Sequence, residues 1–323
     1  MSTLRAAVIG VGYLGNFHAQ KYLALPGVTL VGVADTDAER VAAVAAKCGV
    51  MGTTDYRELL AKVDLVSIVT PPATHFAIAR DALEAGVHVL VEKPVTEHVA
   101  EAEALIALAQ ARRLVFQVGH LERFNPAVLA LRPLVTAPIH IEARRMARYK
   151  ERGTEVDVVL DMMIHDIDIV LSLVDSPLVS IEATGRAVVT DSIDIADVTL
   201  RFASGCVAEL AASRVHLETV RAMKVLQPDS WLAIDFANHA LLSGARQADG
   251  EPAAARDVPL HTQSLVRSDA LMDEISSFVD AVGRGHDPAV TGEDGKRALE
   301  VAVAIAQRIN RQASSLARAG TGH

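Results

Sequence analysis

The stretch Ala6-Ala7-Val8-Ile9-Gly10-Val11-Gly12-Tyr13-Leu14-Gly15 decides the fold, because a short apolar run leads directly into three spaced glycines. A strand, this glycine spacing and then a helical pattern are typical of a dinucleotide-binding turn. Gly10 permits the tight turn, Gly12 lets the main chain approach a pyrophosphate, and Gly15 permits close packing of the helix against the strand. The N–H groups that open the helix would bind the anion.

Asp35 is the acidic partner that such a turn requires. It ends the second apolar run, twenty residues beyond Gly15, where a carboxylate accepts hydrogen bonds from both ribose hydroxyls. A 2′-phosphate would meet Asp35 and Asp37 with no arginine expected nearby, so the sequence favours NAD over NADP. A glycine turn without a ligand is the alternative interpretation. The candidate cofactor-binding residues here are Gly10, Gly12, Tyr13, Leu14, Gly15 and Asp35.

The first part of the chain alternates buried strands with helices. Its apolar runs are rich in Val and Ile and lack polar alternation, which is typical of strands covered on both faces. Helical patterns lie between them, so we expect right-handed crossovers and a doubly wound parallel sheet. The apolar runs are residues 6–9, 30–34, 65–69, 87–91 and 115–118, and helical stretches include 37–47 and 97–111.

After Gly119 the pattern changes to polar and apolar residues in alternation. This predicts a sheet with one covered and one exposed face. We expect a helix at residues 158–174, a closing helix pair and an irregular loop at 243–262. The alternating runs include residues 139–145, 198–202, 207–211, 223–226 and 232–236, and the helix pair covers about 270–282 and 294–309.

The composition excludes several functional classes. With 323 residues, two domains are expected, and a net charge of −9 argues against a general nucleic-acid binder. The 7 Phe, 4 Tyr and 1 Trp are too few for base stacking along a strand. Two cysteines, Cys48 and Cys206, make no disulfide framework and suggest a reducing compartment. Without a targeting segment or a long apolar stretch, we expect a soluble, cytoplasmic protein with no membrane partner.

The tip of the fourth main run carries Glu92-Lys93-Pro94. In open α/β sheets, ligands lie beyond the carboxyl ends of the strands, where Lys93 and the neighbouring Thr70-Pro71-Pro72 emerge. A lysine there can donate a hydrogen bond to a substrate oxygen or stabilise an alkoxide. Pro94 limits where Lys93 points. The alternative is a solvated surface charge.

The expected helix at 158–174 carries Asp161, His165 and Asp168 on one face, because their spacing is i, i+4, i+7. Its other positions are apolar, and buried charges need partners or a task. A histidine near carboxylates can take a proton from an alcohol around neutral pH, while the carboxylate fixes its tautomer. A metal site is the competing functional interpretation, and a satisfied network within the core is the structural one.

Together and in this order, these motifs resemble the glucose-fructose oxidoreductase / inositol dehydrogenase / rhizopine-catabolism (Gfo/Idh/MocA) family, with the match extended by residues 288–295. The resemblance implies residues 1–121 as a Rossmann domain and residues 122–323 as an α+β domain for substrate binding and oligomerisation. The second domain would have a large, open, mainly antiparallel sheet, with its C-terminal helices packing back toward the Rossmann domain. It implies a nicotinamide cofactor, catalysis by Lys93, His165 and Asp161, and cofactor contacts from Thr70, Pro72, His75, Glu92 and Lys93.

Within that family, residues 118–126 and 161–168 look more like the branch that oxidises the C3 hydroxyl of UDP-N-acetylglucosamine to a ketone. Many members have a glycine pair shortly before the helix aspartate, where this chain has residues 156–160 without glycine. The alternatives are a dehydrogenase of a free polyol or sugar such as an inositol, and a regulator that binds NAD and a sugar without turnover.

A basic cluster supports a diphosphate substrate. Arginine binds phosphate in a bidentate fork, although some of these side chains would simply be the exposed side of a strand. The cluster comprises Arg144, Arg145, Arg148, Lys150 and Arg152, with Arg123 upstream. Strand alternation reduces this cluster to Arg123, Arg148 and Tyr149. Together with Asn125 and His165, they are the candidate substrate-binding residues. A broad sheet face with apolar positions also predicts a homo-dimer or homo-tetramer.

Overall fold

The computed structural model describes residues 3–150, 156–236, 238–245 and 261–320. The chain forms two compact units, Met1–Phe124 with Asp269–Leu299, and Asn125–Ser268 with Glu300–His323. The expected division placed residues 269–299 in the second domain with the helices packing back. In the structure these residues are part of the first unit.

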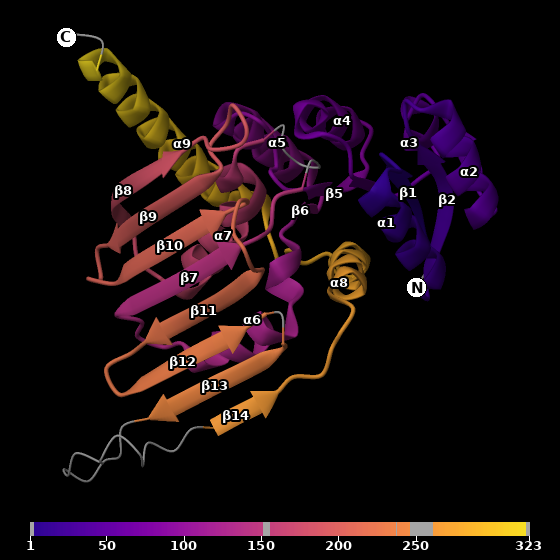
Figure 1. The fold of residues 1–323 in the computed structure, drawn as a ribbon. Helices are drawn as coiled ribbons and strands as arrows, with labels where there is room; N and C mark the ends of the chain where they lie inside the picture. Colours follow the sequence, from indigo (N-terminus) through magenta and orange to yellow (C-terminus); the bar gives the residue numbers. More distant parts are fainter. Residues whose placement is uncertain (1–2, 151–155, 237, 246–260, 321–323) are drawn as a thin grey trace. The chain divides into compact units, whose positions relative to one another are not determined.

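The first unit is built on a six-stranded parallel sheet with the order β3-β2-β1-β4-β5-β6 (Figure 1). The order reverses between β1 and β4, which is the position where open α/β sheets bind ligands. The predicted doubly wound parallel sheet is confirmed, and only the short β3 was not expected. The strands are β1 (Leu4–Ile9), β2 (Val28–Ala34), β3 (Met51–Thr53), β4 (Leu65–Ile68), β5 (His88–Glu92) and β6 (Phe116–Gly119).

Helices cover the first sheet, and local signals fix their ends. Asp37 accepts a hydrogen bond from the Arg40 N–H at 3.0 Å and so caps α2, which ends at Gly49 in a left-handed conformation. Tyr22 and Phe278 are fully buried in the core that α8 shares with α1. The helices are α1 (Tyr13–Ala24), α2 (Ala38–Cys48), α3 (Arg57–Leu60), α4 (Pro72–Glu84), α5 (Val99–Arg112), η1 (Leu121–Phe124), α8 (Ala270–Arg284) and the start of α9 (Gly292–Gly320).

The second unit is built on an eight-stranded sheet with the order β14-β13-β12-β11-β7-β10-β9-β8. Its neighbours are antiparallel except β7 and β10, so the mainly antiparallel sheet is confirmed. The expected loop at 243–262 is partly wrong, because β13 and β14 take its two ends; residues 246–260 lie outside the described residues. The strands are β7 (His140–Met146), β8 (Leu178–Arg186), β9 (Ile195–Phe202), β10 (Val207–Ser213), β11 (Val220–Leu226), β12 (Ser230–Asp235), β13 (Ala240–Ala245) and β14 (His261–Ser264).

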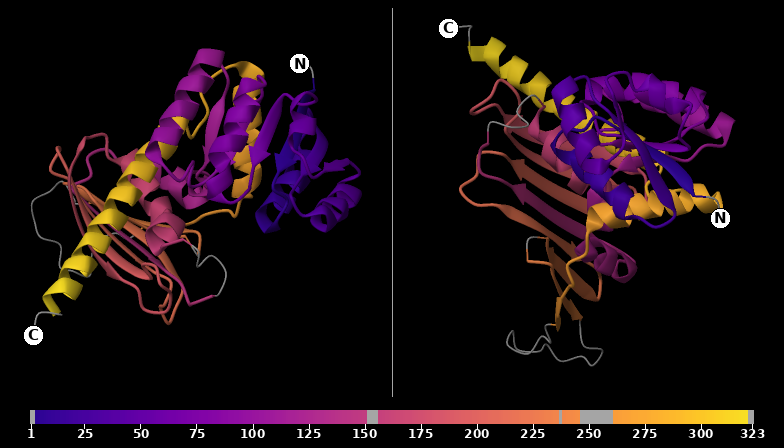
Figure 2. Two further views of the ribbon diagram at one scale, coloured as in Figure 1. Left: turned by 90° about the horizontal axis from the view of Figure 1, so that it is seen from above. Right: turned by 90° about the vertical axis from the view of Figure 1, so that its right-hand side faces the viewer.

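Helices pack on one face of this second sheet. Strand alternation turns Ile141 and Ala143 of β7 toward them, while Glu142 and Arg144 point the other way. In both views of Figure 2 the C-terminal part of α9, drawn in yellow, runs alongside the strands. Ile309 of α9 packs at Gly185 of β8, where a Cβ would lie 3.0 Å from its side chain. The remaining helices are α6 (Pro126–Leu131), η2 (Arg132–Leu134), the π-helix η3 (Val159–Met163) and α7 (Ile164–Leu173).

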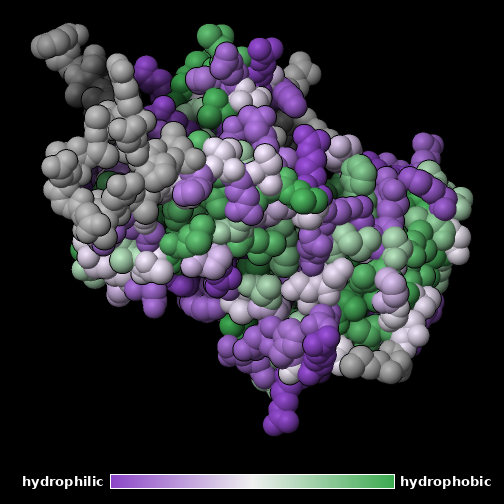
Figure 3. All heavy atoms as spheres, turned by 90° about the horizontal axis from the view of Figure 1, so that it is seen from below, coloured by the Kyte–Doolittle hydropathy of each residue, from purple (hydrophilic) through white to green (hydrophobic). Residues whose placement is uncertain are grey.

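The surface mixes apolar and polar side chains. Figure 3 shows one face, on which green and purple residues are interspersed. Among the described residues, no helix has the length and apolar character needed to cross a membrane.

Candidate active site

The turn between β1 and α1 gives each of its glycines a separate steric reason. Gly10 has a φ of +87°, and a Cβ there would lie 2.5 Å from the Val69 carbonyl oxygen. A Cβ on Gly15 would lie 1.8 Å from the Gly10 carbonyl oxygen. At Gly12, by contrast, no described atom lies within 4 Å of the position of a Cβ. Gly10 and Gly15 therefore serve the turn itself, and Gly12 borders open space at a helix N-terminus, where a pyrophosphate fits.

Asp35 lies at the end of β2 and is tied to that turn. Its carboxylate accepts hydrogen bonds from the Val11 N–H at 2.8 Å and the Asp37 N–H at 3.1 Å. Arg40, in the first turn of α2, forms ion pairs of 3.1 Å with both Asp35 and Asp37. The expectation of no arginine nearby was therefore wrong, because α2 brings Arg40 back over the end of β2. Arg40 is shared between two carboxylates, so the site keeps an acidic excess, which still suits a ribose hydroxyl better than a phosphate.

His75 links the tips of β4 and β5. Its Nδ1 lies 2.9 Å from the Pro94 carbonyl oxygen, and its Nε2 lies 2.8 Å from the Thr70 carbonyl oxygen. The ring is fully buried, and burial lowers the pKa of His75, against the effect of those carbonyls. Any contribution of His75 to a cofactor site is thus made by holding Thr70 and Pro94. The Lys93–Pro94 peptide is cis, and Pro72 begins α4.

Glu92 points into the first unit. Its side chain is 13% exposed, and its Oε1 lies 3.3 Å from the Nε2 of His18 on α1. Glu274 of α8 joins them in one cluster. Sequence analysis missed His18 and Glu274, because each is a single polar residue in an apolar helix pattern and no local spacing connects α1, β5 and α8.

The Asp/His segment of the second unit begins as a π-helix. Asp157 caps it by accepting hydrogen bonds from the Val159 and Leu160 N–H groups at 2.9 and 3.0 Å. Asp161 and His165 are half-buried, whereas Asp168 is 1% exposed. Asp168 is therefore buried, as the expected largely buried helix allows, and only Asp161 and His165 are partly accessible.

Asp157 and Asp166 are carboxylates of this segment to which the sequence analysis gave no role. Burial raises the pKa of Asp157, against hydrogen bonds from its two main-chain partners. Asp166 accepts two hydrogen bonds from the buried Arg145, from Nε at 3.0 Å and Nη2 at 2.8 Å. Arg145 therefore anchors α7 to β7 and does not serve a substrate phosphate. An N-cap position before an apolar run could have identified Asp157.

The candidate substrate-binding residues occupy different settings. The side chain of Arg123 is 9% exposed, and its Nη2 lies 3.8 Å from Oδ1 of Asp294. Both residues belong to the first unit. Asn125 caps α6 by accepting from the Ala127 N–H at 3.0 Å. Arg148 is exposed and donates to the Leu217 carbonyl at 2.6 Å, and Tyr149 is 41% exposed. Arg152 lies outside the described residues.

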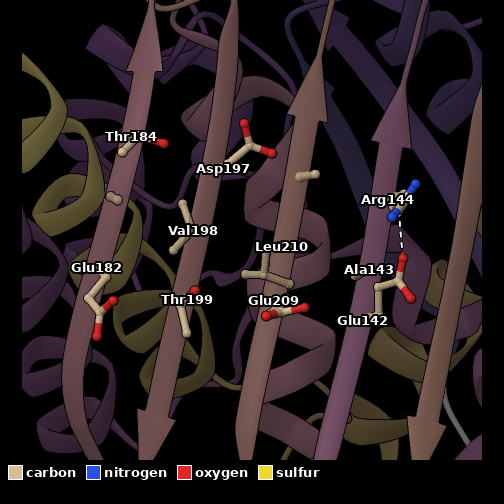
Figure 4. Close-up of a pocket in the computed structure, with 12 residues that line it drawn as sticks. Glu142, Ala143, Arg144, Glu182, Thr184, Asp197, Val198, Thr199, Glu209 and Leu210 are labelled. Atoms are coloured by element: carbon tan, nitrogen blue, oxygen red, sulfur yellow. Dashed lines mark ion pairs between the residues drawn. The ribbon is translucent and has the colours of Figure 1, made fainter.

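The exposed face of the second sheet carries charged side chains over β7 to β10, and it also has apolar positions such as the exposed Leu226. A hollow of about 460 Å³ lies over β7 to β10, with Glu142 and Arg144 facing each other on β7 (Figure 4). Their Oε1 and Nε atoms are 2.6 Å apart. Outward positions on the four strands carry charged groups because solvent covers this face. The other charged residues that line the hollow are Glu182, Asp197 and Glu209.

Both units of the chain match domains of one protein family. Residues 4–120 match the oxidoreductase family with an NAD-binding Rossmann fold, and residues 134–226 match the GFO/IDH/MocA C-terminal domain. The chain is 43% identical over 309 residues to a UDP-N-acetylglucosamine 3-dehydrogenase of Acidithiobacillus ferrooxidans, covering 94% of this chain and 97% of the relative. A solved structure of UDP-N-acetylglucosamine 3-dehydrogenase from that organism has a TM-score of 0.88 at 42% identity, covering 95% of this chain and 97% of the other.

Inositol dehydrogenases are more distant. The scyllo-inositol 2-dehydrogenase (NAD(+)) of Bacillus subtilis is 29% identical, covering 93% of this chain and 92% of the relative. The family resemblance inferred from the motifs is thus confirmed.

Proposed function

The chain belongs to the GFO/IDH/MocA family of NAD-binding oxidoreductases, and from that premise we propose that it oxidises the C3 hydroxyl of UDP-N-acetylglucosamine to a ketone. The observation that carries the proposal is the near full-length likeness to a UDP-N-acetylglucosamine 3-dehydrogenase, which far exceeds the likeness to inositol dehydrogenases. The presence of Lys93 and His165 supports an enzyme over a regulator that binds without turnover.

The first unit offers a cofactor site that fits NAD. The open space at Gly12 admits a pyrophosphate against the first N–H groups of α1. Asp35 is held at the end of β2 by the Val11 N–H, so its carboxylate is oriented before a ribose arrives. When bound, the nicotinamide supplies the hydride acceptor. The remaining cofactor contacts in the proposal come from Tyr13, Leu14, Thr70, Pro72 and Lys93.

In the proposed reaction, three side chains remove the hydroxyl proton and stabilise the resulting alkoxide. His165 takes the proton of the sugar hydroxyl, since an imidazole accepts protons near neutral pH. Lys93 donates a hydrogen bond to the same oxygen and stabilises the alkoxide as it develops. Asp161 orients His165 or a sugar hydroxyl; it precedes His165 by one helical turn, and both are half-buried.

The diphosphate of the substrate would be bound by basic and polar side chains. Arg148 and Tyr149 are exposed at the end of β7 and can donate to phosphate oxygens. Arg123 and Asn125, which flank the junction of the two units in sequence, complete the proposed set. Arg123 is largely buried beside Asp294, so it would act as a fixed charge rather than a mobile one.

A substrate panel tests the proposal. The full chain with NAD+ is given UDP-N-acetylglucosamine, free N-acetylglucosamine, UDP and myo-inositol, and the absorbance of reduced nicotinamide is followed. Of these four compounds, we expect only UDP-N-acetylglucosamine to reduce NAD+. Reduction of NAD+ with myo-inositol would show instead that the substrate is a free polyol. Tight binding of the nucleotide sugar with no reduction under any condition would favour the regulator.

The proposal extends to assembly and compartment. Four carboxylates and one arginine line the hollow on the exposed face of the second sheet, so two copies related by a two-fold axis can pair Glu209 or Glu182 of one copy with Arg144 of the other. We therefore propose a homo-dimer or homo-tetramer, which light scattering tests. Cys48 and Cys206 are both free thiols, which supports a reducing compartment such as the cytoplasm.

A further inference from the structure

A cluster of three ionisable side chains lies inside the first unit, behind Lys93. His18 comes from α1, Glu92 from the end of β5 and Glu274 from α8. One nitrogen or oxygen from each lies within 4.8 Å of those of the other two. His18 and Glu274 are fully buried, and Glu92 is nearly so. The three elements thus converge on one buried polar centre in an apolar core.

The polar atoms of this centre are poorly satisfied. Within the described chain, neither carboxyl oxygen of Glu274 and neither ring nitrogen of His18 has a hydrogen-bond partner. An isolated buried carboxylate costs far more free energy than a neutral carboxylic acid. Two carboxylates this close in a buried site cannot both be charged without a cation, so the cluster of His18, Glu92 and Glu274 holds at least one proton.

Glu274 is the acid that should hold the proton. It is 0% exposed, whereas Glu92 reaches solvent with 13% of its side chain. Burial, with the nearby Glu92 as a second cause, raises the pKa of Glu274 well above its ordinary value. The other titratable groups that sense the cluster are Tyr22, with a pKa raised by burial, and His75, with a pKa lowered by burial.

Glu92 connects the cluster to the proposed active site. Its Oε2 accepts from the Lys93 N–H at 3.3 Å. A Cβ on Gly119 of β6 would lie 3.0 Å from the Glu92 carboxyl group, so this side chain is closely packed as well. Whatever fixes the Glu92 carboxylate therefore fixes the main chain from which Lys93 projects.

We propose that Glu274 is a neutral acid which donates a hydrogen bond to Glu92, and that this buried His18–Glu92–Glu274 cluster positions Lys93. Glu274 is a positioning residue, since it acts through Glu92. The inference rests on the proposed role of Lys93 only for its effect on turnover. The protonation of Glu274 is a property of the protein without cofactor or substrate.

Two measurements test the protonation of Glu274 and its effect on turnover separately. Infrared difference spectra of the full chain detect the carbonyl stretch of a neutral carboxylic acid without any substrate. We compare Glu274→Gln, which keeps a neutral donor, with Glu274→Leu, which keeps the volume but donates nothing. Glu58→Gln, at an exposed position on α3, is the matched control. Turnover with NAD+ and the nucleotide sugar is the second readout.

We expect a neutral carboxyl band at pH 7 that is lost in Glu274→Gln and kept in Glu58→Gln. Turnover should stay within a factor of about three in Glu274→Gln and fall by about tenfold or more in Glu274→Leu, in kcat rather than KM. The absence of the band at pH 7 overturns the neutral acid. So does a stoichiometric metal ion that a chelator removes from the native chain and that Glu274→Gln lacks, because two ionised glutamates and a neutral imidazole can bind a metal ion.

If turnover is undetectable in the native chain, the proposed function fails while the infrared result still tests the state of Glu274. Equal losses of turnover in Glu274→Gln and Glu274→Leu would overturn the positioning role, because a neutral donor would then give no rescue.

Discussion

Asp166 of the second unit and Glu274 of the first are both buried acids on helices, yet they are stabilised in different ways. Asp166 receives two hydrogen bonds from Arg145, whose guanidinium also lies 5.6 Å from the centre of the Phe236 ring. The carboxyl oxygens of Glu274 receive no hydrogen bond from any described group. One acid is neutralised by a cation and the other, in our proposal, by a proton.

The difference indicates that the Arg145–Asp166 pair has a structural role, whereas Glu274 has a role in the proposed reaction. The Arg145–Asp166 pair joins β7 to α7 and holds the helix that carries His165. The Glu274 centre lies beside the strand end that carries Lys93 and contains a group able to change its charge. A buried ion pair resists such change, because removing either partner leaves an uncompensated charge.

The largest effect should follow the loss of one partner of the ion pair. Asp166→Ala should lower the free energy of unfolding of the second unit by about 3–5 kcal/mol, because Arg145 is left buried and unpaired. Urea unfolding followed by the fluorescence of Trp231, the only tryptophan, measures this. The double variant Arg145→Met with Asp166→Leu should recover most of the loss. A loss below about 1 kcal/mol in Asp166→Ala would show that the pair is not what holds α7.

A smaller, pH-dependent effect should mark Glu274. The raised pKa means that the unfolded chain releases this proton first as the pH rises. The stability from the neutral acid is fully present below the ordinary carboxyl pKa and is lost as the pH rises toward the folded pKa. Relative to Glu274→Gln, the native chain should therefore lose stability with rising pH, by at most about 1.4 kcal/mol per pH unit. Unfolding from pH 4 to 9, followed by helix circular dichroism, measures this, and a pH-independent difference would contradict it.

The smallest effect should come from Glu142, a half-buried acid with cations beside it. Burial opposes ionisation of Glu142, but Arg144 and Lys224 outweigh it and lower its pKa. Its contribution is present above the ordinary carboxyl pKa and is lost as the pH falls through the lowered value. Glu142→Gln should therefore cost less than about 1 kcal/mol near pH 7 and nothing in acid. A larger loss at neutral pH, in the same Trp231 assay, would show that the Glu142 ion pairs are stronger than those of a solvated face.

Sequence reasoning succeeded where the chemistry is local in the chain. Gly10 to Gly15 and Asp35 could be predicted because strand, turn and helix follow one another. The second sheet was predicted by alternation, although β8 at one edge and β13 and β14 toward the other edge were not.

Groups that meet only through the tertiary fold could not be predicted. The pairing of Arg145 with Asp166 needs the packing of α7 on β7, and His18 meets Glu274 only because α8 returns to the first unit. Arg40 is an intermediate case, since its place one turn into α2 could have indicated its contact with Asp35.

The central claim is that this chain transfers a hydride from a nucleotide sugar to NAD+ with the help of Lys93. The most direct measurement is a single turnover of UDP-N-acetylglucosamine with NAD+ by Lys93→Met, monitored by the absorbance of reduced nicotinamide. Lys47→Met, exposed in the last turn of α2, is the control. We predict that Lys93→Met still binds NAD+, because the glycine turn and Asp35 are intact, and that it reduces NAD+ at least about 100-fold more slowly. A rate equal to that of Lys47→Met would contradict the account.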